Sequence, residues 1–351
     1  MDDGEASGGE ASGKRTRSKS KPSMFDVAVR AGVSAQTVSR VSMGATNVRP
    51  ATRDKVLAAM SELGYSPNSA ARALRYGTFQ TIGVITHKFS RTGESRTVEA
   101  IVEAARSAQY TVTLVDVESP VSTEVSDAVT RLSNQSIDGL VIIRAESVTP
   151  AMLSIPAGLP VVVSDSRFVG HHPAVGADQL EGSRRAVEHL LGLGHRTVHH
   201  VAGPDSSGPS QLRIDGWRAA LDQAERPAPP IFRGDWTGRS GYEAGKHIAR
   251  DTDATAVFCA NDETAIGVMH ALHEAGRRIP ADVSVAGFDD IALAADVWPP
   301  LTTVRQDFAQ IGERLLELLL RQIRNGERLE DVHETVPVEL VVRESTAPPA
   351  S

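Results

Sequence analysis

The chain has 351 residues, of which 40% are hydrophobic and 23% are charged, as in globular proteins with two or three domains. No stretch approaches the roughly 18 consecutive apolar residues of a membrane span, and the first residues, MDDGEASGGEASG, are acidic where a secretory signal is basic and then apolar. A single cysteine, Cys259, excludes an internal disulfide and is interpreted as a small core residue. We therefore expect a cytoplasmic protein with no membrane contact.

The charge is unevenly distributed along the chain. Its net charge is -7, but residues 1–78 hold 12 Lys and Arg against 7 Asp and Glu, whereas the remainder holds 25 against 37. A basic front on an acidic body indicates one domain that faces a polyanion. Residues 1–22, which include the basic run KRTRSKSK, contain almost nothing apolar and are expected to be a disordered tail.

Residues 23–67 predict three short helices. Ser23 and Asp26 form a capping box before the first helix, and a glycine ends it. The apolar stripe of that helix is Phe25, Val27, Ala28 and Ala31. Ser34 caps a second helix, and Pro50 starts a third. Two short helices around a tight turn, with a third to close the core, form the helix-turn-helix arrangement of DNA-binding domains.

After residue 67 the pattern of apolar residues changes. Residues 68–76 form a helix-capable segment shorter than the roughly 12 to 15 residues that an isolated helix needs, so it folds only when something holds it. Beyond it, β-rich runs alternate with amphipathic helices, as in parallel α/β units. Strands are predicted at TIGVIT, TVTLVDV, GLVII, PVVVS, TVHHVAG, TAVFCA, VSVAGF and VELVV, and helices from near Glu94, Ser122, Leu180, Leu212, Gly238, Asn261 and Gln306. About 270 such residues exceed one core, which predicts a doubly wound body of two lobes with a ligand cleft at their strand ends.

The runs FDVAVRAGVSAQTVSRV and PATRDKVLAAMSELGYSPNSAARAL resemble the start of the LacI/GalR family of regulators. The resemblance continues through EHLLGLGH, VAGPDSS, LRIDGW, GDWTGRSGY, ANDETAIG, VSVAGFDD and PPLTTVRQDF, and covers residues 23–345. It implies an all-α helix-turn-helix headpiece, a hinge helix that folds on DNA, and a two-lobed core like a periplasmic binding protein. The expected divisions are a tail at 1–22, the headpiece at 23–67, the hinge and linker at 68–78, lobe 1 at about 79–179 and 307–335, lobe 2 at about 180–306 and 336–345, and a tail at 346–351.

The resemblance places the second helix of the headpiece in the major groove of operator DNA. Ala35, Gln36 and Arg40 match the family's base-reading positions, and Thr37 and Asn68 belong to the same expected interface. Arg can bond a guanine edge and Gln an adenine edge, whereas Ala offers only an apolar contact. Leu74 matches the leucine that family members wedge into the minor groove, where it would unstack a base step and bend the duplex.

The family's ligand positions also map onto this sequence. They are His87, Arg91, Asp165, Arg213, Trp236, Asn261, Asp289 and Gln306. Carboxylates, guanidinium and amide groups bond vicinal hydroxyls, and an indole packs against the face of a pyranose, so these side chains suit a sugar. A charged or phosphorylated sugar stays an alternative, since His87 and Arg91 can add cationic donors. No cofactor and no metal site is expected.

Two other functions compete with a regulator. An enzyme would show a nucleophile elbow, a phosphate loop, a metal cluster or a dinucleotide fingerprint, and the sequence has none. A soluble sugar-binding receptor shares the two-lobed core, but the headpiece and the missing signal peptide argue against it. The end VVRESTAPPAS lacks leucine heptads for tetramers, so a homodimer on a pseudo-palindromic operator is expected. The family contains members released by ligand and members recruited by it, and our hypothesis is release.

Overall fold

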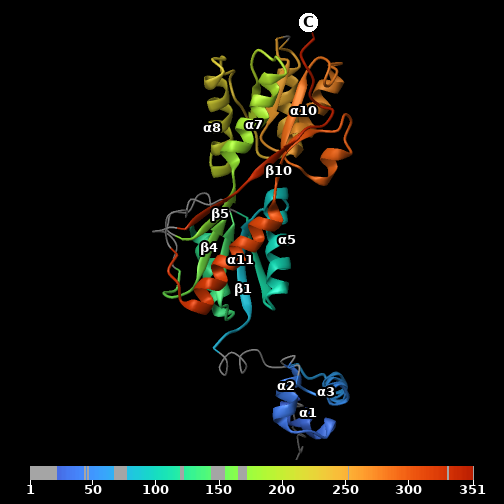
Figure 1. Ribbon diagram of the computed structural model, residues 1–351, viewed down its shortest axis with the longest axis vertical. Coiled ribbons are helices and arrows are strands. Elements are labelled where there is room, and N and C mark those ends of the chain that lie inside the picture. Colours follow the sequence, from blue (N-terminus) through green and yellow to red (C-terminus); the bar gives the residue numbers. More distant parts are fainter. Residues whose placement is uncertain are drawn as a thin grey trace, which may run out of the picture. The chain divides into compact units, whose positions relative to one another are not determined.

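The computed structural model describes residues 22–42, 45, 47–66, 77–118, 122–143, 155–164, 172–251, 253–329 and 332–350. They belong to two compact units, residues 1–77 and residues 78–351 (Figure 1). Residues 1–21 of the expected tail and residues 68–76 of the expected hinge helix lie outside the described residues, as do Asn68, Leu74 and Asp165. No helix in the described part of the chain is long and apolar enough to cross a membrane.

The first unit contains the three expected helices, α1 (Met24–Ala31), α2 (Ala35–Ser42) and α3 (Pro50–Leu63). The capping box of Ser23 and Asp26 is confirmed, and Gly32 ends α1 with a φ of 66°, a left-handed conformation that favours glycine. The core consists of Val27, Ala28, Val38, Val41, Val56, Ala59 and Met60. The prediction for Phe25 is wrong: its side chain is 71% exposed. Phe25 lies about 200° around the helix from Val27, so it faces away from the core.

Lobe 1 of the second unit is a six-stranded sheet in the order β11-β5-β4-β3-β1-β2, and its neighbouring strands are parallel. The strands are β1 (Thr81–His87), β2 (Thr111–Val117), β3 (Gly139–Ile143), β4 (Val161–Ser164), β5 (Ala174–Ala177) and β11 (His333–Val336). Helices α5 (Thr92–Ser107) and α11 (Phe308–Asn325) pack together on one face, and α6 (Ser122–Asn134) covers the other. Because both faces are covered, β1 and β3 are almost entirely buried.

Lobe 2 repeats this architecture with the order β12-β10-β9-β8-β6-β7. The strands are β6 (His199–Ala202), β7 (Phe232–Arg233), β8 (Ala256–Cys259), β9 (Ser284–Asp289), β10 (Thr302–Gln306) and β12 (Val338–Val341). Helices α7 (Gln179–Gly192) and α8 (Gly208–Gln223) cover one face, and α9 (Gly238–Ile248) and α10 (Asp262–Glu274) cover the other. The expected doubly wound, two-lobed core is therefore confirmed.

The chain passes between the lobes three times. The crossings lie at Asp178, between β5 and α7, at Asp307, between β10 and α11, and at Pro337, between β11 and β12. The expected lobe boundaries fell one or two residues from these positions. Because Pro337 alone separates β11 from β12, β12 continues into lobe 2 in a direction opposite to that of β10. The edge pair of β10 and β12 is therefore antiparallel, where the sequence predicted a parallel sheet.

Four short strands were not predicted from the sequence, namely β5, β7, β10 and β11. All the runs that were predicted as strands contain one. Helix α8 begins at Gly208, four residues before the expected start, because Ser207 caps it by accepting a hydrogen bond from the Ser210 amide.

His200 in β6 provides a test of the lobe 2 core. Its ring is fully buried and stacks between Trp217 and Phe258, and burial lowers the pKa of His200 to about 4. Because this folded-state pKa lies below the ordinary value, the unfolded chain takes up a proton that the folded chain excludes. We expect this one residue to remove about 2 kcal/mol of stability between about pH 7.5 and pH 5.

The measurement is urea unfolding at both pH values. His200→Gln is expected to be less stable overall but to lose this part of the pH dependence. His273→Gln, which changes an exposed histidine of α10, should keep the slope of the parent chain. Equal slopes in the parent and His200→Gln would show that His200 does not carry this effect.

Candidate functional site

Helix α2 presents one exposed and one buried face. Val38, Ser39 and Val41 are buried against the headpiece core, whereas Ala35, Gln36 and Arg40 are exposed. Thr37 is half-buried, and its hydroxyl lies 3.0 Å from the hydroxyl of Ser34. The structure therefore places three of the expected base-reading side chains on the solvent face of one helix.

Helix α2 is held by its amino-terminal cap and by Val38 and Val41, which pack in the headpiece core. The Ser34 hydroxyl accepts a hydrogen bond from the Thr37 amide at 3.2 Å, which caps α2. Arg30 of α1 and Glu62 of α3 form an ion pair at 2.7 Å, so these two helices are joined on the surface. The exposed side chains of α2 are thus carried by a small but fixed scaffold.

A cleft of about 290 Å³ lies between the lobes of the second unit, where the carboxyl ends of the strands of both sheets meet. Lobe 1 contributes the segment 90–94 after β1. Lobe 2 contributes the segments after β7 and β8, the last residue of β9, and Arg213 of α8. Ligands bind doubly wound sheets at these strand ends. The lining residues are Ser90, Arg91, Thr92, Gly93, Glu94, Arg213, Asp235, Trp236, Thr237, Gly238, Asn261, Glu263 and Asp289.

Arg213 of α8 organises the floor of this cleft. Its side chain is 1% exposed, its Nε donates to Gln179 Oε1 at 2.8 Å, and another nitrogen donates to the Ala260 carbonyl. Its NH2 group lies 3.2 Å from Asp289 Oδ1. The guanidinium also stacks on the Phe288 ring, with Cζ 3.7 Å from the centroid. Such a buried charge is held only when every donor is used and paired.

Asp289 occupies the end of β9 in an unusual backbone conformation. Its φ is 108°, a value that L residues rarely adopt, and the side chain accepts a hydrogen bond from Gln306 Nε2 at 2.6 Å. Gln306 in turn accepts one from Gln179 at 3.1 Å. Strained backbone of this kind is kept where surrounding contacts fix it, and it gathers at binding sites.

Trp236 forms a buried wall of the cleft. Its indole packs flat on Gly203, where a Cβ atom would lie 2.5 Å from the ring, so only glycine fits. Its carbonyl accepts a hydrogen bond from Asn261 Nδ2 at 3.0 Å, while Asn261 Oδ1 caps α10. The Trp236 Nε1 donor is buried and has no hydrogen-bond partner among the described residues.

One hydrogen bond joins the two lobes inside the cleft. The hydroxyl of Thr92, at the start of α5 in lobe 1, donates to Glu263 Oε1 in α10 of lobe 2. The other Glu263 oxygen accepts from Asn261 Nδ2 at 2.8 Å. Burial and the negative charge of Asp289 raise the pKa of Glu263. The contact therefore ties lobe closure to a carboxyl group on the cleft wall.

The structure brings together five of the predicted ligand residues on the wall of this cleft. They are Arg91, Arg213, Trp236, Asn261 and Asp289. Gln306 stands behind the wall and reaches it through Asp289. His87 is not among the lining residues, because its Nε2 lies 3.1 Å from the Glu118 carbonyl at the end of β2. Burial lowers the pKa of His87, which disfavours its charged form, and its role as a cationic donor stays a prediction.

The sequence did not single out two carboxylates of the cleft, Asp235 and Glu263. Asp235 accepts a hydrogen bond from the Thr237 amide at 3.1 Å, as in an ordinary turn before a helix. Glu263 lies in the first turn of α10, where acidic residues are common. Neither position has a local signal that distinguishes it from a helix start.

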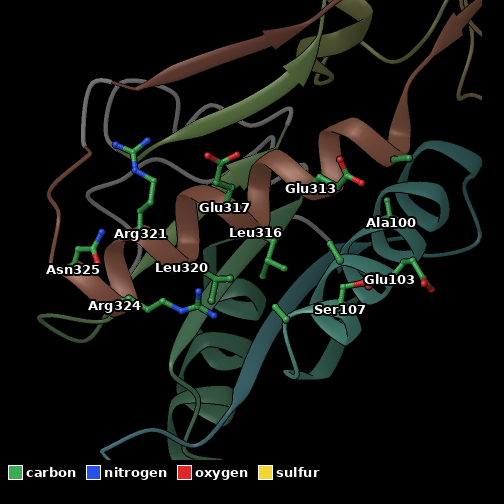
Figure 2. Close-up of a pocket in the computed structure, with 13 residues that line it drawn as sticks. Ala100, Glu103, Ser107, Glu313, Leu316, Glu317, Leu320, Arg321, Arg324 and Asn325 are labelled. Carbon is green, nitrogen blue, oxygen red and sulfur yellow. Dashed lines mark hydrogen bonds between the residues drawn. The ribbon is translucent and has the colours of Figure 1, made fainter.

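A larger hollow of about 630 Å³ lies on lobe 1 between α5 and α11. Figure 2 shows the flanks of the two helices that line it, with Leu316 and Leu320 among surface charges such as Glu103 and Arg324. None of the predicted ligand residues lines it. Polar groups converge in the smaller cleft, and such convergence marks a specific site better than volume does.

The described residues contain no group of three His, Cys, Asp or Glu side chains placed to hold a metal ion. His195 lies within 3.1 Å of the Ser284 hydroxyl and 3.0 Å of the Thr255 hydroxyl, and Cys259 is fully buried in the lobe 2 core. The burial of Cys259 agrees with its interpretation as a small core residue.

Comparison with known proteins decides the family. A model described as bacterial regulatory proteins of the lacI family matches residues 23–68, and one for a periplasmic binding protein-like domain matches residues 187–346. The lactose operon repressor of Escherichia coli strain K12 is 36% identical over 333 residues, which are 93% of this chain and 91% of the repressor. The chain belongs to the lacI family. The resemblance seen in the sequence is thereby confirmed.

Solved structures of the lacI family share the fold. A crystal structure of the Lac repressor dimer bound to operator and the anti-inducer ONPF has a TM-score of 0.81 and 34% identity, and covers 93% of this chain and 99% of that one. A complex of the transcriptional regulator CelR with cellobiose has a TM-score of 0.69 and 31% identity, and covers 92% and 99%.

The buried pair of Arg213 and Asp289 leads to a stability prediction. Arg213→Met leaves the Asp289 carboxylate buried without its guanidinium and should lower the free energy of unfolding by about 3 to 5 kcal/mol. Asp289→Asn in the same chain removes the stranded charge and should recover at least about 1 kcal/mol. Urea unfolding of the parent, the two single variants and the double variant measures this coupling, and strictly additive effects would contradict it.

Proposed function

We propose that this protein is a transcriptional repressor that binds a pseudo-palindromic operator as a homodimer and is released from it by a sugar bound between the core lobes. It acts in the cytoplasm and binds its ligand without transforming it. The observation that carries the proposal is one chain with an exposed recognition helix and a polar cleft at the strand ends of two lobes.

The headpiece supports specific DNA binding. Gln36 and Arg40 are exposed on the same helix, and their side chains match the edges of adenine and guanine in the major groove. Ala35 offers a small apolar surface beside them, suited to a thymine methyl group. Thr37, Asn68 and Leu74 stay assigned to the operator interface as predictions.

The cleft supports a sugar as the ligand. Arg213, Asp289 and Asn261 supply donors and acceptors for hydroxyls, and the indole of Trp236 supplies a flat apolar wall. A volume of about 290 Å³ lies at the lower end of the range for small-molecule pockets, so a small sugar fits better than a long oligosaccharide. The relative with cellobiose bound is consistent with this class of ligand. Asp165 stays a predicted contributor.

The two-lobed construction supplies a route from ligand to DNA. Both lobes line the cleft, and only three crossings join them, so a ligand that contacts both sides favours one relative arrangement of the lobes. A ligand shifts operator affinity only by its preference for one core state, and DNA must reciprocally shift ligand affinity. Release by the sugar requires that it prefer the state with weaker operator binding.

The base-reading role of α2 is tested with an operator selected from random DNA. Gln36→Ala and Arg40→Ala should each weaken binding to that operator by about 10- to 100-fold, because a bidentate base contact is lost. Fluorescence anisotropy on the operator and on unrelated DNA of equal length measures the change. Lys55→Ala, an exposed charge of α3, should affect both DNAs equally or neither. Equal losses on both DNAs for Gln36→Ala and Arg40→Ala would contradict base reading.

The allosteric coupling is tested by titrating the operator complex with a panel of sugars. The effector should weaken operator binding by at least about 5-fold. Asn261→Ser keeps a side-chain oxygen that can cap α10 but removes the amide group that is proposed to contact the sugar. The variant should therefore bind the sugar at least about 10-fold more weakly than the parent chain. Its operator affinity without sugar should stay that of the parent chain.

Two results would overturn parts of this proposal. A sugar that tightens operator binding would show recruitment in place of release. Tight sugar binding together with weak DNA binding that lacks sequence preference would show a sugar receptor.

A further inference from the structure

Among the residues that the structure describes on the wall of the cleft, carboxylates outnumber cations. Its described cations are Arg91 and Arg213, and its described carboxylates are Glu94, Asp235, Glu263 and Asp289. Arg91 NH1 lies 3.7 Å from Glu94 Oε1, and Arg213 NH2 lies 3.2 Å from Asp289 Oδ1. Each guanidinium therefore already faces a carboxylate, and among the described lining residues two carboxylates, Glu263 and Asp235, are in excess.

The side chains that donate hydrogen bonds to the Glu263 carboxylate are neutral. Its two oxygens accept from the Thr92 hydroxyl and from Asn261 Nδ2. Among the described residues no Lys or Arg forms an ion pair with Glu263 or Asp235, although Arg213 acts on Glu263 at longer range. A carboxylate in such surroundings favours a cation as its next neighbour.

The helix dipole does not account for the position of the Glu263 side chain. Asp262, the first residue of α10, is fully buried and accepts hydrogen bonds from the Ile291 amide at 2.9 Å and the Thr303 hydroxyl at 2.5 Å. It already places a carboxyl group at the helix start. Glu263 lines the cavity instead and contacts Thr92 of the opposite lobe.

We propose that the effector is a polyol that carries a protonated amine, an amino sugar by class, and that Glu263, assisted by Asp235, selects its positive charge. This rests on the proposed function of the cleft as a sugar site. The hydroxyls contact Arg213, Asp289 and Asn261, and the ammonium group lies against Glu263, where it can donate to both oxygens. The same charges disfavour a phosphorylated or acidic sugar.

The experiment is isothermal titration of the full chain with matched pairs of sugars. The pairs are glucose and glucosamine, galactose and galactosamine, and mannose and mannosamine, with glucose 6-phosphate and glucuronate as anionic members. For the stereochemistry that binds, the amine should bind at least about 10-fold more tightly than its neutral partner, and the anions at least about 10-fold more weakly.

Two variants separate charge selection from a structural role. Glu263→Gln keeps the size and one acceptor oxygen, and it should reduce the preference for the amine over its neutral partner to within about 3-fold. Asp235→Asn should also reduce the preference for the amino sugar over its neutral partner. It provides an independent test if Glu263→Gln folds poorly. Asp222→Asn, an exposed carboxylate of α8, is the matched control and should leave the preference unchanged.

The outcomes distinguish this inference from the function on which it rests. A neutral or anionic sugar that binds as tightly as its amine, or a preference that survives in both variants, overturns the inference and leaves the sugar-responsive regulator intact. If no sugar of any charge binds or alters operator affinity, the proposed function itself fails.

Discussion

The buried contact between Arg213 and Asp289 is the interaction on which the core depends. It joins α8 to the end of β9, and through Gln179 and Gln306 it extends to α7 and β10. A guanidinium that is 1% exposed has given up its water, so its donors need acceptors in the protein or in a bound ligand. The segments after several strands are therefore held at one point, which is also the floor of the cleft.

The contacts that stabilise the buried Arg213 also fix the side chains on the wall of the cleft. Asp289 is kept at a φ of 108° because Arg213 and Gln306 hold its side chain, and Trp236 closes on Gly203 beside them. The polar groups on the wall of the cleft are then fixed in place without a ligand. Fixed groups lose less conformational entropy on binding, which favours affinity for a small polar molecule.

The fold was largely predictable from sequence, and the site only in part. Runs rich in Val and Ile gave eight strands correctly, whereas β5 (AVGA) and β11 (HETV) are short and lack such a run, so only pairing within the sheet reveals them. The family resemblance supplied Arg213. The contact of Thr92 with Glu263 depends on how closely two lobes approach, and local sequence does not encode that distance.

The three crossings also govern how the chain is completed during synthesis. The sheet of lobe 1 lacks its edge strand β11 until residue 336 has been made, and the sheet of lobe 2 lacks β12 until residue 341. Neither sheet can therefore be completed when only the first segment of its lobe has been synthesised, and both are completed almost together, once residues 336–341 have been made. A premature stop near residue 330 would leave two incomplete sheets with exposed edges, which promote aggregation.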